Sequence, residues 1–242
     1  MQYDWTANGA ALRSKIDMDN NVSTVYGYDN AGRQTSVVES SGNIGLRGTW
    51  TEYDDANRTV TVKSDLKAYG DVLLQTRTYY DQLGRVKLAQ QSDGSALTNN
   101  TSGIKTQVIV KYPTLVNGQW TGERMTLTTT PYRNLNDTTL EWSCTQYDTV
   151  GRIKRVSTFT GSTPPTNCSS TDNRTGVTQM AYNAEWTTAT DPAGKVRKQR
   201  VDALGRLVEV VEDPGSGPNA LNYITAYEYD ALDNLTKVTQ GG

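Results

Sequence analysis

Histidine is absent from the 242 residues of the chain. Its absence excludes Ser-His-Asp and Cys-His catalysis, zinc sites that use histidine, and the side chain that most often exchanges protons near neutral pH. Aspartates recur along the chain, but no pair of carboxylates is singled out for glycoside hydrolysis. We therefore predict no catalytic, cofactor-binding or metal-binding residues, and a protein that is not an enzyme.

Long apolar stretches are missing as well. Hydrophobic residues make up 35% of the chain, and Phe159 is its one phenylalanine. No segment reaches the roughly 20 apolar residues that span a bilayer. Residues 1–11 lack the basic start and the apolar core of a signal peptide. The expectation is a chain without a membrane span, exported by another route or cut from a longer protein, and we favour the longer protein.

Neither sign of charge dominates. Lysine and arginine number 24 and aspartate and glutamate 26, which gives a net charge of -2. A chain so balanced has no electrostatic reason to bind nucleic acid or an anionic membrane. We predict no nucleic-acid partner.

Tyrosine, threonine and glycine are abundant instead, with 14 tyrosines and 21 glycines. Tyrosine and threonine suit a half-buried pleated surface, and glycine supplies turns. The composition therefore predicts an all-β fold.

A six-residue pattern recurs along the chain and sets its organisation. Four copies have the form Tyr/Val-Asp-x-x-Gly-Arg, with Asp29, Gly32 and Arg33; Asp81, Gly84 and Arg85; Asp148, Gly151 and Arg152; and Asp202, Gly205 and Arg206. Looser copies begin with Asp17, Asp54, Asp191 and Asp230. The aspartate can accept a hydrogen bond from the backbone two residues on, which starts a turn. The residue three positions later is expected to have a positive φ, which suits Gly, Asn or Asp.

Hydrophobic residues often follow the turns at a spacing of three, as in Val86 and Ala89 or Leu207 and Val210. In a regular strand this spacing places the two side chains on opposite faces. Either both faces are partly covered, or a bulge shifts the register. The sequence leaves both alternatives open.

The intervals between copies predict the topology. Asp17 and Asp29 lie 12 residues apart, which fits one strand, whereas Asp29 and Asp54 lie 25 apart, which fits two. We predict an antiparallel meander of hairpins in a single β domain over residues 1–242. The pattern weakens between Asp81 and Asp148, where Asp93-Gly94 and Asn117-Gly118 are typical of hairpin turns.

The repeated Tyr-Asp-x-x-Gly-Arg unit resembles the RHS or YD repeat, and its eight copies cover residues 16–240. That family includes bacterial polymorphic toxins, the shell component of insecticidal toxin complexes, and teneurins. The resemblance implies a curved β-strip that spirals around a hollow interior and forms part of a shell. It also implies a secreted or cell-surface bacterial protein, whose partners are the rest of a longer RHS chain and an enclosed C-terminal polypeptide.

The sequence departs from the family at one point. The family's core ends in an Asp-Pro-x-Gly-Leu or Asp-Pro-x-Gly-Trp motif with a self-cleaving aspartate centre. Asp191-Pro192-Ala193-Gly194 resembles this motif only locally, because Lys195 follows as in an ordinary repeat turn. We therefore expect a non-enzymatic wall that encloses a polypeptide or presents a surface.

Three further expectations concern contacts. Open edge strands would let the chain associate with itself, as in a cell-surface adhesin or fibre subunit. A glycan partner would use whichever of the five tryptophans are exposed, namely Trp5, Trp50, Trp120, Trp142 and Trp186. Cys144 and Cys168 lie 24 residues apart, so they are candidates for a disulfide between neighbouring strands, and two free buried thiols are nearly as well supported.

Overall fold

The computed structural model describes residues 1–5, 11–94, 97, 103–215 and 220–241. These residues form strands and turns and no helix. The first strands are β1 (Gln2–Trp5), β2 (Leu12–Asp17), β3 (Val22–Tyr28), β4 (Gln34–Ser41), β5 (Ile44–Asp54), β6 (Thr59–Ser64), β7 (Leu74–Tyr80), β8 (Val86–Ser92), β9 (Lys105–Lys111) and β10 (Thr114–Val116). The others are β11 (Gln119–Thr121), β12 (Met125–Thr129), β13 (Glu141–Tyr147), β14 (Ile153–Thr160), β15 (Arg174–Asn183), β16 (Trp186–Thr190), β17 (Val196–Val201), β18 (Leu207–Glu212), β19 (Tyr223–Tyr229) and β20 (Leu235–Gly241).

Eighteen of these strands belong to one open antiparallel sheet, and β10 and β11 form a separate two-stranded sheet. The predicted all-β class and antiparallel meander are confirmed. Contacts divide the chain into two compact units. Unit 1 comprises Met1–Lys111, Leu127–Glu141 and Gly161–Thr163, and unit 2 comprises Tyr112–Thr126, Trp142–Thr160 and Pro164–Gly242. The single domain and the spiral remain predictions.

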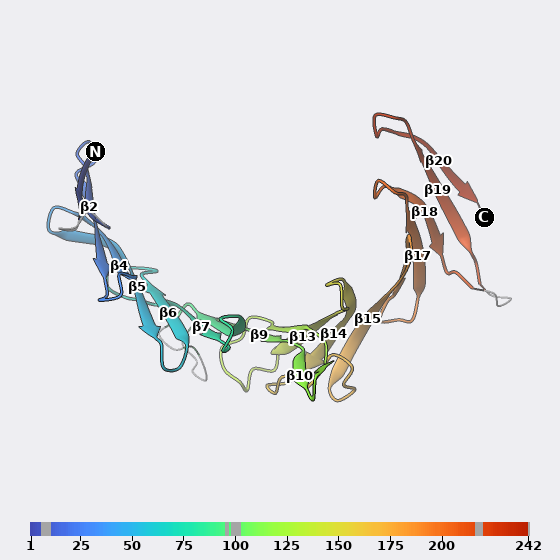
Figure 1. Cartoon of the computed structure of the whole chain (residues 1–242), viewed down its shortest axis with the longest axis horizontal. Coiled ribbons are helices and arrows are strands. Elements are labelled where there is room, and N and C mark those ends of the chain that lie inside the picture. The colour runs from blue at the N-terminus through green and yellow to red at the C-terminus, as the bar shows by residue number, and fades with distance from the viewer. Residues whose placement is uncertain (6–10, 95–96, 98–102, 216–219, 242) are drawn as a thin grey trace. The chain divides into compact units, whose positions relative to one another are not determined.

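In unit 1, β1 to β9 pair in sequence order, each antiparallel to the strand before it. Figure 1 shows this run from the blue β2 to the green β9. The turns after Asp29, Asp54 and Asp81 join β3 to β4, β5 to β6 and β7 to β8, so all three lie on one side of the sheet, where these strands end. The turn after Asp17 joins β2 to β3 and lies at the opposite ends of the strands. Turns at opposite ends of the strands are separated by one strand, as Asp17 and Asp29 are, and turns at the same end are separated by two strands, as Asp29 and Asp54 are.

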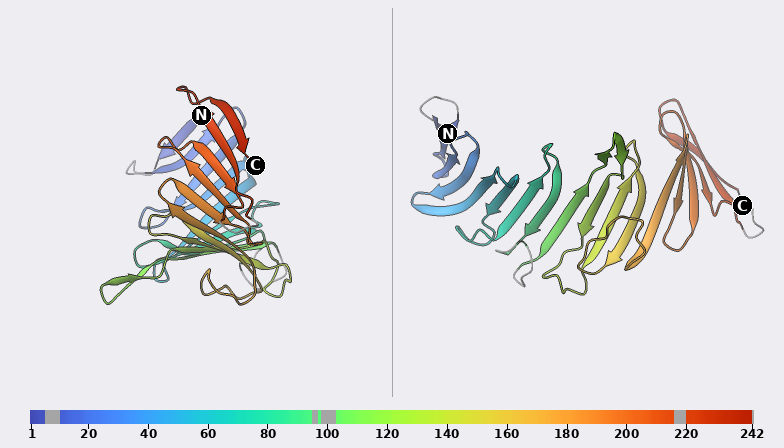
Figure 2. Two further views of the ribbon diagram at one scale, coloured as in Figure 1. Left: turned by 90° about the vertical axis from the view of Figure 1, so that its right-hand side faces the viewer. Right: turned by 60° about the horizontal axis from the view of Figure 1, so that its bottom comes forward.

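In unit 2, β14 to β20 likewise pair antiparallel in sequence order, as the right-hand view of Figure 2 shows for the orange and red strands. The turns after Asp148, Asp202 and Asp230 lie at one end of the strands, and the turn after Asp191 lies at the other end. The β10–β11 hairpin turns at Asn117 and Gly118, which both have a positive φ, as a tight turn requires. Asp93 and Gly94, in unit 1, begin the connection from β8 to β9, and these two strands pair as an antiparallel hairpin with a longer loop.

After the turns at Asp81, Asp202 and Asp230 a bulge explains the hydrophobic spacing, whereas Val22 and Val25 lie on a stretch of β3 without a bulge. Tyr80 pairs with Val86 while Tyr79 pairs with Leu88, so Lys87 is an extra residue between Val86 and Ala89. The same irregularity follows the turns at Asp29, Asp202 and Asp230. One extra residue restores residues three apart to the same face, so the spacing after those three turns reflects the bulge.

Two of the looser turns differ from the prediction. In the copies that begin with Asp17 and Asp54, the positive φ falls at Asn21 and Arg58, one position later than expected. Asp17 pairs with Val22 and Asp54 with Thr59, so each loop holds four residues and is followed by no bulge. The asparagines expected to adopt the positive φ instead donate through their side-chain amides to the aspartates, at 2.8 Å for Asn20 and 2.7 Å for Asn57.

Each unit buries a few large side chains. In unit 2, Trp142 and Phe159 are 1% exposed. In unit 1, Leu127, Tyr132 and Leu140 are buried to a similar degree. Elsewhere the sheet of unit 1 buries polar side chains, among them Thr61, Gln75 and Gln90. The stability of most hairpins therefore depends on contacts between neighbours, as in other repeat proteins.

Candidate functional site: the arginine–tyrosine junctions between hairpins

The regular repeat turns share one hydrogen-bond geometry, which the turn at Asp29 illustrates. The Asp29 Oδ1 atom accepts the backbone N–H groups of Ala31 and Arg33, both at 2.9 Å. The Gly32 N–H donates to the Asp29 carbonyl at 3.0 Å, and Gly32 has a φ of 79°. This arrangement is a three-residue hairpin loop closed by a residue in the left-handed region. The aspartate is thus the acceptor that holds the turn.

The three other regular turns repeat this geometry. Asp81, Asp148 and Asp202 each accept the N–H groups two and four residues on. Gly84, Gly151 and Gly205 have positive φ values of 74°, 89° and 81°. A turn of this kind needs only residues within its own six-residue segment, so the sequence pattern specifies it locally.

The arginine of each regular turn binds the aspartate that begins the turn. The Nε atoms of Arg33, Arg85, Arg152 and Arg206 donate to an aspartate Oδ2 at 2.7 to 2.8 Å. In the first turn, the hydrogen bonds from the side chain and backbone of Arg33 lower the pKa of the Asp29 carboxyl. Asp29 is therefore ionised at neutral pH, and its oxygens are occupied by the turn.

In unit 1, Arg33 also contacts the repeat that follows its own. The Arg33 Nη1 and Nη2 atoms donate to the two carboxylate oxygens of Asp55 at 2.7 and 3.0 Å. The guanidinium lies 4.2 Å from the centroid of the Tyr53 ring, a cation–π distance. The Tyr53 hydroxyl donates back to the Gln34 carbonyl at 3.0 Å. Arg33 and Tyr53 therefore link two hairpins in both directions.

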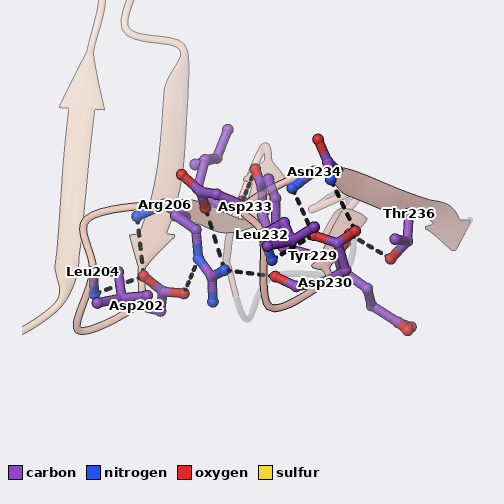
Figure 3. Close-up of polar contacts among 11 residues, drawn as sticks. Asp202, Leu204, Arg206, Tyr229, Asp230, Leu232, Asp233, Asn234 and Thr236 are labelled. Atoms are coloured by element: carbon purple, nitrogen blue, oxygen red, sulfur yellow. Dashed lines mark hydrogen bonds and ion pairs between the residues drawn. The ribbon is translucent and has the colours of Figure 1, made fainter.

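Among the described residues of unit 2, Arg206 and Arg152 form junctions of the same kind. The Arg206 guanidinium lies 5.0 Å from the centroid of the Tyr229 ring, and the Tyr229 hydroxyl donates to the Leu207 carbonyl at 2.9 Å. Figure 3 shows Arg206 between Asp202 of its own turn and Asp233 of the next, which its Nη1 atom reaches at 3.3 Å.

In the other junction, the Arg152 guanidinium lies 4.1 Å from the centroid of the Tyr182 ring. The Tyr182 hydroxyl donates to the Ile153 carbonyl at 2.8 Å. In both junctions of unit 2, as in unit 1, the accepting carbonyl belongs to the residue that follows the arginine.

The sequence pattern did not identify Tyr182. This tyrosine precedes a two-residue turn at Ala184 and Glu185 between β15 and β16, and Ala184 has the positive φ. The turn lacks the Asp-x-x-Gly sequence, although it occupies the place that a repeat turn has elsewhere. A tyrosine near the end of one strand, just before a tight turn to the next, is the sequence signal that would have identified Tyr182.

The two cysteines are joined by a disulfide, with their Cα atoms 5.3 Å apart. Cys144 lies on β13, whereas Cys168 lies in the connection between β14 and β15, so the expectation that both cysteines lie on neighbouring strands is wrong. Both residues are fully buried, and the Ser157 hydroxyl donates to the Cys168 carbonyl at 2.8 Å. The bridge therefore fastens a loop to the sheet within unit 2.

The described tryptophans differ in their exposure. Trp142 is buried, Trp5 is 54% exposed, and Trp50 is half-buried. The Trp186 ring is covered by Lys198, whose Nζ lies 4.2 Å from the ring centroid. The side chain of Trp120 lies outside the described part of the chain. Among the described tryptophans, only Trp5 offers the exposed aromatic face that a glycan would need.

Within the described ranges, no three His, Cys, Asp or Glu side chains are grouped so that they could ligate a metal ion. A helix of membrane-spanning length and hydropathy does not occur there either.

No protein-family model matches the chain, and no curated protein sequence matches it. Among solved structures, the chain is similar to a chain in the crystal structure of TcdB2-TccC3-Cdc42, with a TM-score of 0.35 and 13% identity. The similarity covers 98% of this chain and 15% of that chain. The strand order and the recurring junctions define the class of protein, which is a β-hairpin repeat protein with an open antiparallel sheet.

Proposed function

We propose that the chain is a structural wall segment of an exported bacterial RHS-repeat protein. The observation that carries the proposal is the recurrence of one junction at Arg33, Arg152 and Arg206, in which an arginine binds its own turn and stacks on the tyrosine of the next. Each such contact joins successive hairpins on the side of the sheet where the repeat turns lie. Repeated nearest-neighbour contacts are the way a repeat array becomes a continuous surface.

The polar groups of the motif are used up by this architecture, which favours a wall over an enzyme. The Asp202 carboxylate accepts two backbone N–H groups and the Arg206 side chain. A general acid or base needs a carboxyl that can reach a substrate and exchange a proton with it. The aspartates of the four regular turns do not meet that requirement, so we propose a non-enzymatic role in which the wall encloses a polypeptide or presents a surface.

Limited proteolysis of the native gene product tests whether this wall encloses a polypeptide. An enclosed segment resists trypsin while the repeat region is intact, and it is digested once mild denaturant opens the repeats. The repeat region itself serves as the internal control for protease activity. Equal digestion of every other segment before and after opening would contradict enclosure.

A second candidate function follows from the last strand. In the described residues β20 pairs only with β19, and its side chains are exposed along its whole length. Leu235 and Val238 are each 51% exposed. An unpaired strand edge can recruit a strand from another chain. This observation favours a surface adhesin or fibre subunit that assembles by edge pairing.

Light scattering with negative-stain imaging of the purified chain separates the two candidates. A monomer favours the wall segment, whereas ordered filaments or rings favour edge pairing. If filaments form, Gln240→Pro on β20 removes a backbone donor from the open edge and should abolish them, because the alternation of the β19–β20 register directs the Gln240 N–H away from β19. Thr187→Ser on the interior strand β16 is the control and should leave them intact.

A further inference from the structure

One face of unit 1 carries an open cleft with a volume of about 520 Å3. Two rows of paired residues form its floor. Glu52 pairs with Thr61, which pairs with Arg77, and Asp54 pairs with Thr59, which pairs with Tyr79. Residues two apart on a strand point to the same face, so both rows face the cleft. Lys87, the bulged residue of β8, completes the lining.

Arg77 is held in place but keeps its terminal donors. Its Nε atom donates to the Thr61 hydroxyl at 3.0 Å, and Thr61 is 3% exposed. Among the described residues, neither terminal nitrogen of Arg77 has a hydrogen-bond partner, and neither does the Lys87 ammonium. The planar guanidinium therefore offers a fixed fork of donors to a ligand.

The acceptors of the cleft are ionised carboxylates. Asp54 accepts the side-chain amide of Asn57 at 2.7 Å and its backbone N–H at 3.0 Å. These hydrogen bonds lower the pKa of the Asp54 carboxyl, and the charge of Arg77 lowers it further. Glu52 forms an ion pair with Lys63. Each carboxylate has about four lone-pair sites, so both retain capacity for further donors.

Tyr79 gives the cleft an aromatic wall. In the part of the chain that the structure describes, its hydroxyl has no partner. The neighbouring Tyr53 also lines the cleft, but Arg33 covers its ring and its hydroxyl is bonded to Gln34. Tyr79 is therefore the aromatic residue that is free to contact a ligand.

We propose that this cleft binds an uncharged saccharide. The charges of its lining cancel, with Glu52 and Asp54 opposing Arg77 and Lys87, so the cleft has no net preference for an ion of either sign. Sugar hydroxyls both donate and accept hydrogen bonds, and they match a lining of carboxylates and free cationic donors. The C–H face of a sugar ring is apolar and fits against Tyr79. The volume lies within the roughly 300–1,000 Å3 of small-molecule sites.

The test is a titration of the purified chain with neutral disaccharides, namely lactose, maltose and N,N′-diacetylchitobiose, followed by 1H–15N NMR. A sulfated heparin disaccharide is the charged comparison. We expect shifts at residues 52–87 with at least one neutral probe. Arg77→Met should weaken that binding by about tenfold or more, because it removes the donor fork and keeps the apolar stem. Lys87→Met gives the same test at an exposed position, where folding is not at risk.

The matched control is Arg197→Met, which removes an exposed arginine from β17 in unit 2 and should leave binding unchanged. No shift with any neutral probe overturns the proposal, as does a response to the sulfated probe alone. Unchanged binding in both Arg77→Met and Lys87→Met removes the cleft as the site. None of these outcomes bears on the wall function, because the variants change Arg77 and Lys87, which take no part in the arginine–tyrosine junctions.

Discussion

The Tyr229 hydroxyl donates to the carbonyl of Leu207 at 2.9 Å, although 22 residues separate the two in the sequence. Leu207 is the residue that follows Arg206, and the Arg206 guanidinium in turn stacks on the Tyr229 ring. The tyrosine therefore joins its own hairpin to the preceding one through its hydroxyl and its ring at once. The same two contacts recur at Tyr53 and Tyr182.

Removing one hydroxyl isolates the hydrogen-bond part of this junction. Tyr229→Phe keeps the ring under Arg206 and leaves the Leu207 carbonyl without its donor, so it should lower the free energy of unfolding by about 1 kcal/mol. Tyr223→Phe on the same strand is the control, because Tyr223 is 49% exposed and its hydroxyl has no partner among the described residues. Urea unfolding followed by tryptophan fluorescence measures both. Equal stabilities of the two variants would contradict the junction.

The sequence predicted the turns well because they are local. Asp29 and Gly32 bond within one segment of six residues, so their types and spacing are sufficient to specify the turn. The strand order followed from the intervals between turns, for the same reason. These features depend on few residues and on no distant contact.

The junctions could not be predicted in this way, because the arginine and the tyrosine of each junction lie 20 to 30 residues apart in the sequence and meet only when neighbouring strands pair. Arg33 meets Tyr53 only after the register of β4 and β5 is fixed, and the pattern does not specify that register. Asn20 and Asn57 were misassigned because a four-residue loop moves the positive φ by one position. Cys168 was expected on a strand, but it lies in a loop whose path the repeat interval does not determine.

The glycine of the regular turn should be replaceable only by residues that tolerate a positive φ. At Gly205 the φ is 81°, and a Cβ there would meet no atom within 4 Å, so the cost of a substitution comes from the backbone alone. Gly205→Ala should therefore cost about 1–2 kcal/mol. Gly205→Asn should cost less, because asparagine visits this region more readily and Asp233 already occupies the same slot with a φ of 70°. Thermal unfolding of the two variants gives the order, and an alanine variant as stable as the asparagine one would refute it.

The disulfide of unit 2 should contribute to stability by restricting the unfolded chain. It closes a loop of 24 residues, for which the chain-entropy model gives about 3 kcal/mol. Adding a reductant should lower the midpoint of urea unfolding. The double variant Cys144→Ala with Cys168→Ala should have the lower midpoint with or without reductant. A reductant that shifts the double variant as much as the wild-type chain would show that the effect does not come from this bridge.

The far turn between β6 and β7 gives a pH-dependent prediction. The Asp71 carboxylate accepts the backbone N–H groups of Leu66, Lys67, Ala68 and Leu73, and these bonds, that of Leu66 first, lower its pKa from 3.8 to about 2. A carboxyl whose pKa is lower in the folded chain stabilises the fold above its unfolded pKa, and this contribution is lost as the pH falls through the folded pKa. Asp71→Asn should therefore destabilise the chain at pH 7.

The difference in unfolding midpoint between the wild-type chain and Asp71→Asn should be constant above pH 4 and shrink between about pH 4 and pH 2. Asp172→Asn is the control, because the Asp172 side chain is exposed and makes no hydrogen bond within the described residues. The unfolding midpoint of Asp172→Asn should match that of the wild-type chain over the same pH range. A difference for Asp71→Asn that stays constant down to pH 2 would mean that the turn depends on the shape of the side chain and not on its charge.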